Sequence, residues 1–186
     1  MRGCQELPRT RPALTKEEKA AAIVAVAERQ LLKHGYEALS IAAIARELGI
    51  AQNSIYWYFP SKDHLFVAAL ERMLRAIAAR KPSRSQGTIE RILWFTDQFA
   101  ALSELRGAMT ERARSSEVVA AFVAELDALL SRMLSNAFRD YIPEGDLDIA
   151  VDSFRATVEG TFAKGLDRRK RRRVLTFALE RLIGHN

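Results

Sequence analysis

Cysteine is almost absent from the chain, and its scarcity excludes two kinds of site. Cys4 is the only cysteine among 186 residues, so neither an intrachain disulfide nor a cysteine-based zinc site can form. His34, His64 and His185 have no partner four residues away with metal-binding chemistry. We therefore expect no metal, no cofactor and a reducing, cytoplasmic location.

Long apolar runs are also missing. The run over residues 20–27 is far shorter than the roughly 20 apolar residues that span a bilayer. The first 14 residues lack the apolar core of a secretory signal. We expect no membrane partner and a disordered tail over 1–14, whose Arg2, Arg9 and Arg11 could alternatively lie in a DNA minor groove.

The usual catalytic signatures are absent as well. The sequence contains no G-x-S-x-G motif, no H-E-x-x-H motif and no cysteine–histidine pairing. We expect the chain not to be an enzyme, and an all-α enzyme is the least favoured alternative. A helical module whose exposed aromatic residues contact another protein is a second alternative, because tyrosine and tryptophan also favour protein interfaces.

No segment shows the two-residue alternation of a strand. Apolar residues recur three and four positions apart, which predicts an all-α protein of about nine helices. The polar segment 81–87 separates four predicted helices from five. We expect one domain over 15–80, including a linking helix over 61–80, and a larger helical domain over 81–186.

The charge of the chain favours a polyanionic partner. There are 29 basic and 23 acidic residues, which give a formal net charge of +6. The first 80 residues carry 12 of the basic and 8 of the acidic side chains. The excess positive charge therefore leans towards the N-terminal domain.

The segment 35–65 predicts two short helices joined by a tight turn. Ser40 is a suitable N-cap, and Gly49 allows the left-handed backbone that ends the first helix. In the next helix Ile55 and Phe59 share the inner face, which leaves amide and aromatic side chains on the outer one. The second helix of a helix-turn-helix enters the major groove, where such side chains can contact bases. Lys62 follows in the first turn of the next helix and opposes its dipole, which a nearby phosphate would explain.

At these residues the chain resembles the TetR family of transcriptional regulators. The matching positions are Gly35, Tyr36, Ile44, Ala45, Gly49, Ile55, Tyr56, Tyr58, Phe59, Lys62 and Leu65. The recognition helix starts at Ala51, where the family usually has serine or threonine. The resemblance implies that bases or backbone are contacted by Gln52, Asn53, Ser54 and Trp57, and phosphates by Ser40, Tyr56, Tyr58 and Lys62.

The last two predicted helices carry wide apolar faces that a small bundle cannot cover alone. A second copy could cover them in a four-helix contact, as TetR-like proteins do. Two copies would also read a palindromic operator in successive grooves. The residues expected at this homodimer interface are Val151, Phe154, Val158, Phe162, Val174, Leu175, Ala178 and Leu182.

Aromatic and methionine side chains are frequent between the boundary and these helices. They are Trp94, Phe95, Phe99, Met109, Phe122, Met133 and Phe138. Ordinary core packing explains each one by itself, whereas the resemblance implies a cavity for a small-molecule effector. It further implies a ligand-responsive repressor that its effector releases from DNA, with the helix over 61–80 as the lever.

The densest charge run of the chain is RRKRRR, from Arg168 to Arg173. We expect a solvated helix face there. Contact with an acidic effector or with additional DNA is the alternative.

Overall fold

The described part of the chain is entirely helical. The computed structural model describes residues 15–83 and 85–184, which form nine α-helices and one 3-10 helix and contain no strand. The all-α prediction is confirmed. The tail over 1–14, with Cys4 and its three arginines, and His185 lie outside the described residues. The helices are α1 (Lys16–His34), α2 (Ile41–Leu48), α3 (Gln52–Tyr58), α4 (Lys62–Ala79), α5 (Thr88–Ser103), α6 (Arg106–Ala113), α7 (Glu117–Phe138), the 3-10 helix η1 (Glu144–Asp146), α8 (Leu147–Ala163) and α9 (Arg168–Ile183).

The helix ends follow from local capping chemistry. Thr15 and Glu18 form a reciprocal capping box, with the Thr15 N–H donating to the Glu18 carboxylate at 2.7 Å. Ser40 accepts from the Ala43 N–H at 3.2 Å at the start of α2. Gly49 ends α2 with φ +66°, in the left-handed region where a side chain would be strained.

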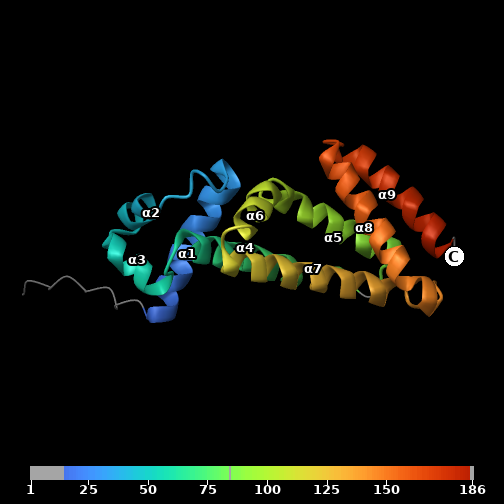
Figure 1. Ribbon diagram of the computed structural model, residues 1–186, viewed down its shortest axis with the longest axis horizontal. Coiled ribbons are helices and arrows are strands. Elements are labelled where there is room, and N and C mark those ends of the chain that lie inside the picture. The colour runs from blue at the N-terminus through green and yellow to red at the C-terminus, as the bar shows by residue number, and fades with distance from the viewer. Residues whose placement is uncertain (1–14, 84, 185–186) are drawn as a thin grey trace, which may run out of the picture.

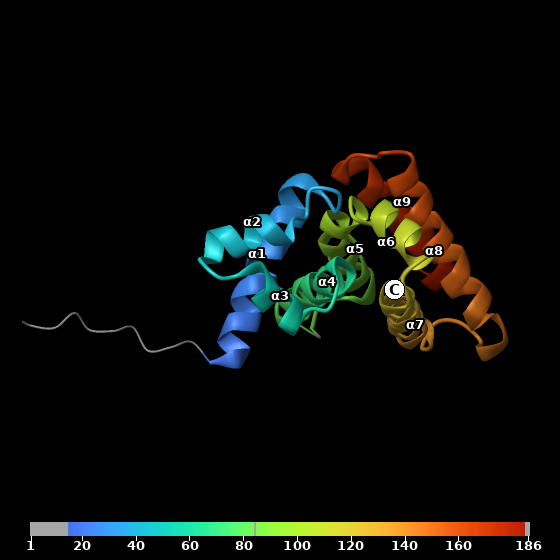
Figure 2. The same ribbon diagram turned by 60° about the vertical axis from the view of Figure 1, so that its left-hand side comes forward.

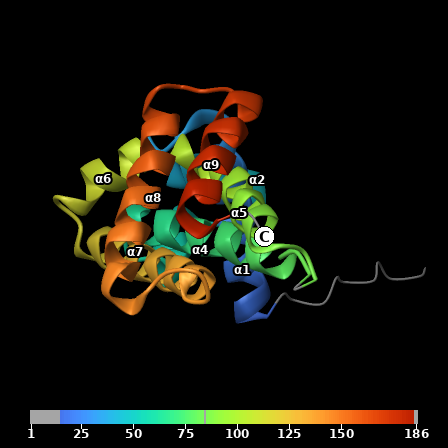
Figure 3. The ribbon, with the colours of Figure 1, turned by 90° about the vertical axis from the view of Figure 1, so that its right-hand side faces the viewer.

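The molecule is elongated, and its two ends differ (Figure 1). Helices α1, α2 and α3 form one end, whereas α8 and α9 form the other, and α4 and α7 run along the length between them. The rotated view in Figure 2 shows the α1–α3 group standing apart from the α8–α9 pair. Figure 3 shows α8 and α9 side by side at the far end, in agreement with their direct packing.

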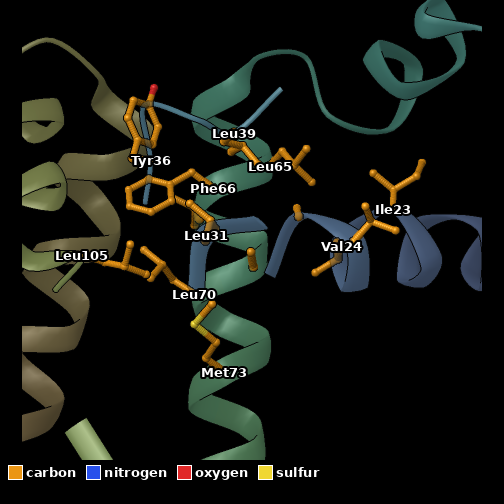
Figure 4. Close-up of a cluster of buried hydrophobic side chains, with 14 of the residues drawn as sticks. Ile23, Val24, Leu31, Tyr36, Leu39, Leu65, Phe66, Leu70, Met73 and Leu105 are labelled. Atoms are coloured by element: carbon orange, nitrogen blue, oxygen red, sulfur yellow. The ribbon is translucent and has the colours of Figure 1, made fainter. Parts of the chain in front are cut away.

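A large apolar cluster joins the α1–α3 group to the rest of the chain. Its centre includes Leu31 of α1 and Phe66 of α4, and the Phe66 ring meets the Tyr36 ring edge-on at a centroid distance of 4.8 Å (Figure 4). Burial of a side chain such as Phe66 contributes about 1.5–3 kcal/mol to stability. Leu105 and Val119 belong to the same cluster, although they follow the polar segment over 81–87. The boundary near residue 80 remains a prediction, and apolar packing crosses it.

A second apolar cluster holds the far end together. Phe138 of α7 and Phe154 of α8 meet edge-on at 5.9 Å between ring centroids. Leu175 and Leu179 of α9 complete this cluster and are almost fully buried. Helix α9 is therefore packed on α5 and α8 by its apolar side.

The basic run at the start of α9 is not a solvated face throughout: the expectation is wrong for the buried Arg171 and the partly buried Arg172, whereas Arg168, Arg169, Lys170 and Arg173 are exposed. Asp97 of α5, only 8% exposed, lies 3.0 Å from Arg168, 3.8 Å from Arg171 and 3.2 Å from Arg172. Arg172 also pairs with Glu90. A buried carboxylate requires such partners, so these pairs fix α9 on α5.

We expect the Asp97→Ala variant to lose about 3 kcal/mol of unfolding free energy, because removal of one partner leaves buried arginine charge without compensation. Urea unfolding followed by circular dichroism would measure the change. Arg173→Ala is the matched control, since this exposed residue has no carboxylate partner within the described ranges, and it should shift stability by only about 0.5 kcal/mol. Equal unfolding midpoints for the two variants would show that Asp97 has no such role.

Candidate nucleic-acid interface and effector cavity

Helices α2 and α3 form the predicted helix-turn-helix. Ile55 of α3 is completely buried in the apolar cluster, and Tyr58 and Phe59 pack against that cluster while partly exposed. The opposite side of α3 is exposed and carries the residues expected to contact DNA, which are Gln52, Asn53, Ser54, Tyr56 and Trp57. Trp57 is 65% exposed, an unusual environment for an indole. Ala51 precedes α3 and has no side chain that could cap it, so no side-chain hydrogen bond satisfies the backbone N–H groups of its first turn.

Two of the residues expected to contact phosphates, Ser40 and Lys62, make contacts within the chain. The Ser40 hydroxyl caps α2, and the Ser40 backbone N–H donates to the Gln30 side chain at 3.2 Å. The Lys62 ammonium lies 4.3 Å above the centre of the Tyr36 ring and donates to the Glu37 carbonyl at 3.3 Å. These two contacts partly offset its unfavourable position at the start of α4, and the contact of Lys62 with a phosphate stays a prediction.

Lys16 was missed by the sequence reading. Its ammonium lies 4.4 Å above the centre of the Trp57 ring, which brings the start of α1 beside the exposed face of α3. Sequence patterns link Lys16 only to its own helix, since 41 positions separate it from Trp57. Lys16 therefore places a positive charge against the exposed Trp57 ring of α3.

Behind α3, a buried carboxylate joins three segments of the chain. Asp63, in the first turn of α4, accepts a hydrogen bond from the Tyr36 hydroxyl at 2.5 Å. Arg112 of α6 donates to the same carboxylate through Nε at 3.1 Å and Nη2 at 2.7 Å. This two-bond geometry fixes orientation as well as distance. Asp63 therefore ties the base of the helix-turn-helix to α6.

The surroundings of Asp63 favour its charged form. The hydrogen bonds from Arg112 lower the pKa of Asp63 to about 2, against the opposing effect of burial, and the Tyr36 hydroxyl acts in the same direction as Arg112. Burial and the bond to Asp63 raise the pKa of Tyr36 far above its ordinary value. At neutral pH Tyr36 is thus a donor and Asp63 an acceptor.

A cavity of about 470 Å³ lies between α5, α6, α7 and α8. Four of the seven residues expected at an effector pocket line it, namely Phe95, Phe99, Met109 and Met133. The other three, Trp94, Phe122 and Phe138, do not. Phe122 and Phe138 are buried in the two apolar clusters, and Trp94 packs edge-on against Phe95 at 5.0 Å. Helical spacing cannot distinguish a core side chain from a cavity wall, because both lie on the inner face.

The outer side of α8 and α9 is apolar in places, although three of the expected interface residues do not reach it. Val151, Phe154 and Leu175 are at most 3% exposed within their own chain, so they have no surface to offer a partner. Exposed apolar side chains on these helices are instead Ile149, Val174 and Phe177. Val158, Phe162, Ala178 and Leu182 are partly exposed. We refer to Ile149, Val174 and Phe177 as the outer apolar face.

The described residues also lack two features, a metal-binding cluster and a membrane-spanning helix. Within residues 15–83 and 85–184, no group of three histidine, cysteine, aspartate or glutamate side chains is arranged to hold a metal ion. None of the described helices is long and apolar enough to cross a membrane.

The fold and the α2–α3 pair define a helix-turn-helix protein with a larger helical body. Residues 23–69 match the sequence model of the family described as bacterial regulatory proteins, tetR family. The helix-turn-helix segment of the chain is therefore similar to the TetR family.

Several relatives are transcriptional regulators that share part of this chain. The HTH-type transcriptional repressor KstR of Rhodococcus jostii is 32% identical over 120 residues, which cover 61% of this chain and 57% of the repressor. The HTH-type transcriptional regulator Mb1846 of Mycobacterium bovis is 35% identical over 100 residues, or 53% of this chain and 42% of the regulator. The chain thus spans about half the length of the curated relatives it matches.

Solved structures share the whole fold at low sequence identity. A transcriptional regulator from Saccharomonospora viridis, in complex with choline, has a TM-score of 0.76 at 17% identity and covers 92% of this chain and 100% of its own. BioQ, bound to its natural double-stranded DNA operator, has a TM-score of 0.62 at 24% identity and covers 89% and 98%. These matches extend the likeness from the helix-turn-helix to the helical body.

The depressed pKa of Asp63 predicts how its contribution to stability depends on pH. A carboxylate whose pKa is lower in the folded state stabilises the fold above its unfolded pKa of about 3.8, and this stabilisation is lost as the pH falls towards about 2. The excess stability of the unchanged protein over Asp63→Asn should therefore be complete at pH 6 and shrink steadily between pH 4 and pH 2. Urea unfolding of both proteins at several pH values would measure it, and a constant difference over that range would contradict it.

Proposed function

We propose that this chain is a DNA-binding transcriptional regulator, and specifically a repressor that binds a palindromic operator as a homodimer and is released by a small-molecule effector. Such a protein works in the cytoplasm, where bacterial DNA lies. The proposal rests chiefly on one observation, the exposed polar and aromatic face of α3 within a segment that matches the TetR family. The relatives named above are transcriptional regulators, and BioQ binds an operator through the same fold.

The chemistry of α3 suits the major groove. Gln52 and Asn53 offer carboxamides that can make paired hydrogen bonds with an adenine edge. Tyr56 and Tyr58 have hydroxyls that can reach phosphates, and Trp57 can pack against the sugar–phosphate backbone. Lys16 and Lys62 supply the positive charge beside them. Ser40 and Ser54 are the remaining polar residues proposed at this interface.

The homodimer would form through the outer apolar face. Ile149 and Phe177 are 69% and 60% exposed, although both are large apolar side chains. A symmetric contact between two copies of α8 and α9 would cover them. It would also set the spacing of two α3 helices to successive major grooves, about 34 Å apart.

The effector would act through α6 and α4. Arg106 and Met109 of α6 line the cavity, and Arg112 of the same helix holds Asp63 of α4. A ligand that prefers one position of α6 would therefore alter the support of the helix-turn-helix. By linkage, such a ligand weakens DNA binding by the same factor as DNA weakens ligand binding.

Two substitutions would separate the proposed roles in DNA binding. Gln52→Ala should relax preference at one base pair in each half-site by about 1–3 kcal/mol, because the side chain is proposed to read a base edge. Lys62→Ala should weaken binding to all sequences and reduce the slope of affinity against salt by about 1, because it is proposed to contact phosphate. Fluorescence anisotropy with a duplex selected from genomic fragments and with random duplex, at several salt concentrations, would measure both effects.

Lys164→Ala is a suitable control for these variants, since this exposed lysine lies at the end of α8, away from α3. It should leave both affinities unchanged. An equal loss on selected and random DNA for Gln52→Ala and Lys62→Ala would contradict the assigned roles. A shallow salt dependence of the unchanged protein would instead favour the protein-interaction module.

Phe177→Glu should convert the proposed dimer into a monomer, because it would replace an apolar ring in the middle of the contact with a charged side chain that must lose its water. Analytical ultracentrifugation would report the change, and affinity for the selected duplex should fall with it. Leu32→Glu is the control, since Leu32 is 49% exposed and belongs to α1, a helix at the opposite end of the molecule from α8 and α9 (Figure 1). A dimer that survives Phe177→Glu, or a monomeric unchanged protein, would refute this interface.

A further inference from the structure

The wall of the cavity is largely apolar but carries several charged residues. Phe95, Phe99, Met133, Val158 and Phe162 supply much of its apolar surface. Its volume of about 470 Å³ is within the range of sites for drug-sized ligands. The apolar wall predicts a ligand with a substantial hydrocarbon part, and the charged groups determine what else that ligand must carry.

Several polar groups at the cavity are already paired within the chain. The Thr96 hydroxyl donates to the Ile92 carbonyl at 3.0 Å, and the Ser103 hydroxyl donates to the Ala100 carbonyl at 2.6 Å. Arg155 is bound by the carboxylate of Asp127. It also donates to the Ser131 hydroxyl at 2.7 Å. These groups therefore have little need of a partner in a ligand.

Arg91 and Arg106 differ from Arg155. Both line the cavity and are partly buried, and no carboxylate of the described residues lies within 4 Å of either one. Lys81 adds a further exposed cation at the edge. The only acidic residue in the wall is Glu159, which is exposed and lies near enough to Arg155 to stabilise its charge. The cavity thus has a positive excess that its own carboxylates do not neutralise.

The two arginines stand at opposite ends of an apolar stripe. Arg91 is in the first turn of α5, and Arg106 is the first residue of α6. Between them α5 turns Ile92, Phe95 and Phe99 towards the cavity. From Arg91 to the end of α5 at Ser103 the helix rises about 18 Å, so the lining is long as well as apolar.

We propose that the cavity takes an elongated apolar molecule with an anionic group, such as a carboxylate, whose charge pairs with Arg91 or Arg106. This proposal names the chemical class of the effector in the proposed function. It rests on that function only for the role of the ligand as an effector, and not for its binding to the cavity. An anion gains a charge-assisted hydrogen bond from a guanidinium that has no other carboxylate, and its hydrocarbon part gains from burial among the aromatic and methionine side chains. An equally long cation would meet like charge at both ends and lose affinity.

Three molecules with the same ten-carbon chain separate charge from hydrophobicity. They are decanoate, decan-1-ol and decyltrimethylammonium, each titrated below its micelle concentration into the DNA-free, full-length protein in a calorimeter. We expect decanoate to bind about tenfold more tightly than the other two, the difference that one charge-assisted hydrogen bond contributes. Equal or tighter binding of the cation, or no binding of decanoate at millimolar concentration, would overturn the proposal.

Substitutions at the two arginines locate the effect. Arg91→Gln combined with Arg106→Gln should abolish the preference for decanoate while the alcohol still binds, which also shows that the cavity is intact. Arg91→Glu with Arg106→Glu should reverse the preference towards decyltrimethylammonium. Arg132→Ala, an exposed cation of α7 outside the cavity lining, is the matched control and should retain the preference. Retention of the preference in the double glutamine variant would overturn the assignment to Arg91 and Arg106.

The titrations can contradict the proposed ligand class without contradicting the proposed DNA binding, and the reverse also holds. The titrations contain no DNA, so a protein that ignores DNA can still bind decanoate and thereby support the cavity assignment. Conversely, a protein that binds its operator and shows no preference for decanoate would refute the ligand class while leaving DNA binding supported.

Discussion

The buried carboxylate of Asp63 constrains the position of the helix-turn-helix relative to the rest of the chain. It accepts hydrogen bonds from Tyr36, which follows α1, and from Arg112 of α6, and it lies in the first turn of α4. A charged group in this position is costly if its partners move away. The base of the helix-turn-helix, α4 and α6 therefore keep one relative arrangement, and the direction in which α3 points depends on it.

Helix α6 is short, but it belongs to both the cavity and the Asp63 cluster. Arg106 and Met109 face the cavity, whereas Arg112, one to two turns further along, holds Asp63. A rigid helix transmits a shift at one end to the other, since its backbone hydrogen bonds resist bending. The cavity is thus connected to the base of the helix-turn-helix by a single short helix. A molecule in the cavity would shift this arrangement only by as much as it distinguishes two positions of that helix.

Charge and hydrophobicity have different roles at the two ends of the molecule. Apolar clusters provide most of the burial, but they are compatible with many rotations of a helix, because dispersion and the hydrophobic effect have little directionality. Ion pairs are directional and select one rotation. Asp97 fixes the arginines of α9 on α5, which leaves Phe177 pointing outwards. Asp63 acts in the same way at the other end.

The sequence alone determined the helices, their caps, the turn at Gly49 and the exposed face of α3, because periodicity and capping act between residues at most four apart. The apolar character of the last two helices could also be predicted from these patterns. The four cavity residues were expected only from the resemblance to TetR regulators, because helical spacing does not separate a cavity wall from core. Only the tertiary structure decided that Asp63 pairs with Arg112, that Phe138 is core and not cavity, and that Phe177 is exposed whereas Leu175 is covered. Those outcomes depend on which helices meet and at what rotation, and contacts between residues tens of positions apart leave no local pattern in the sequence.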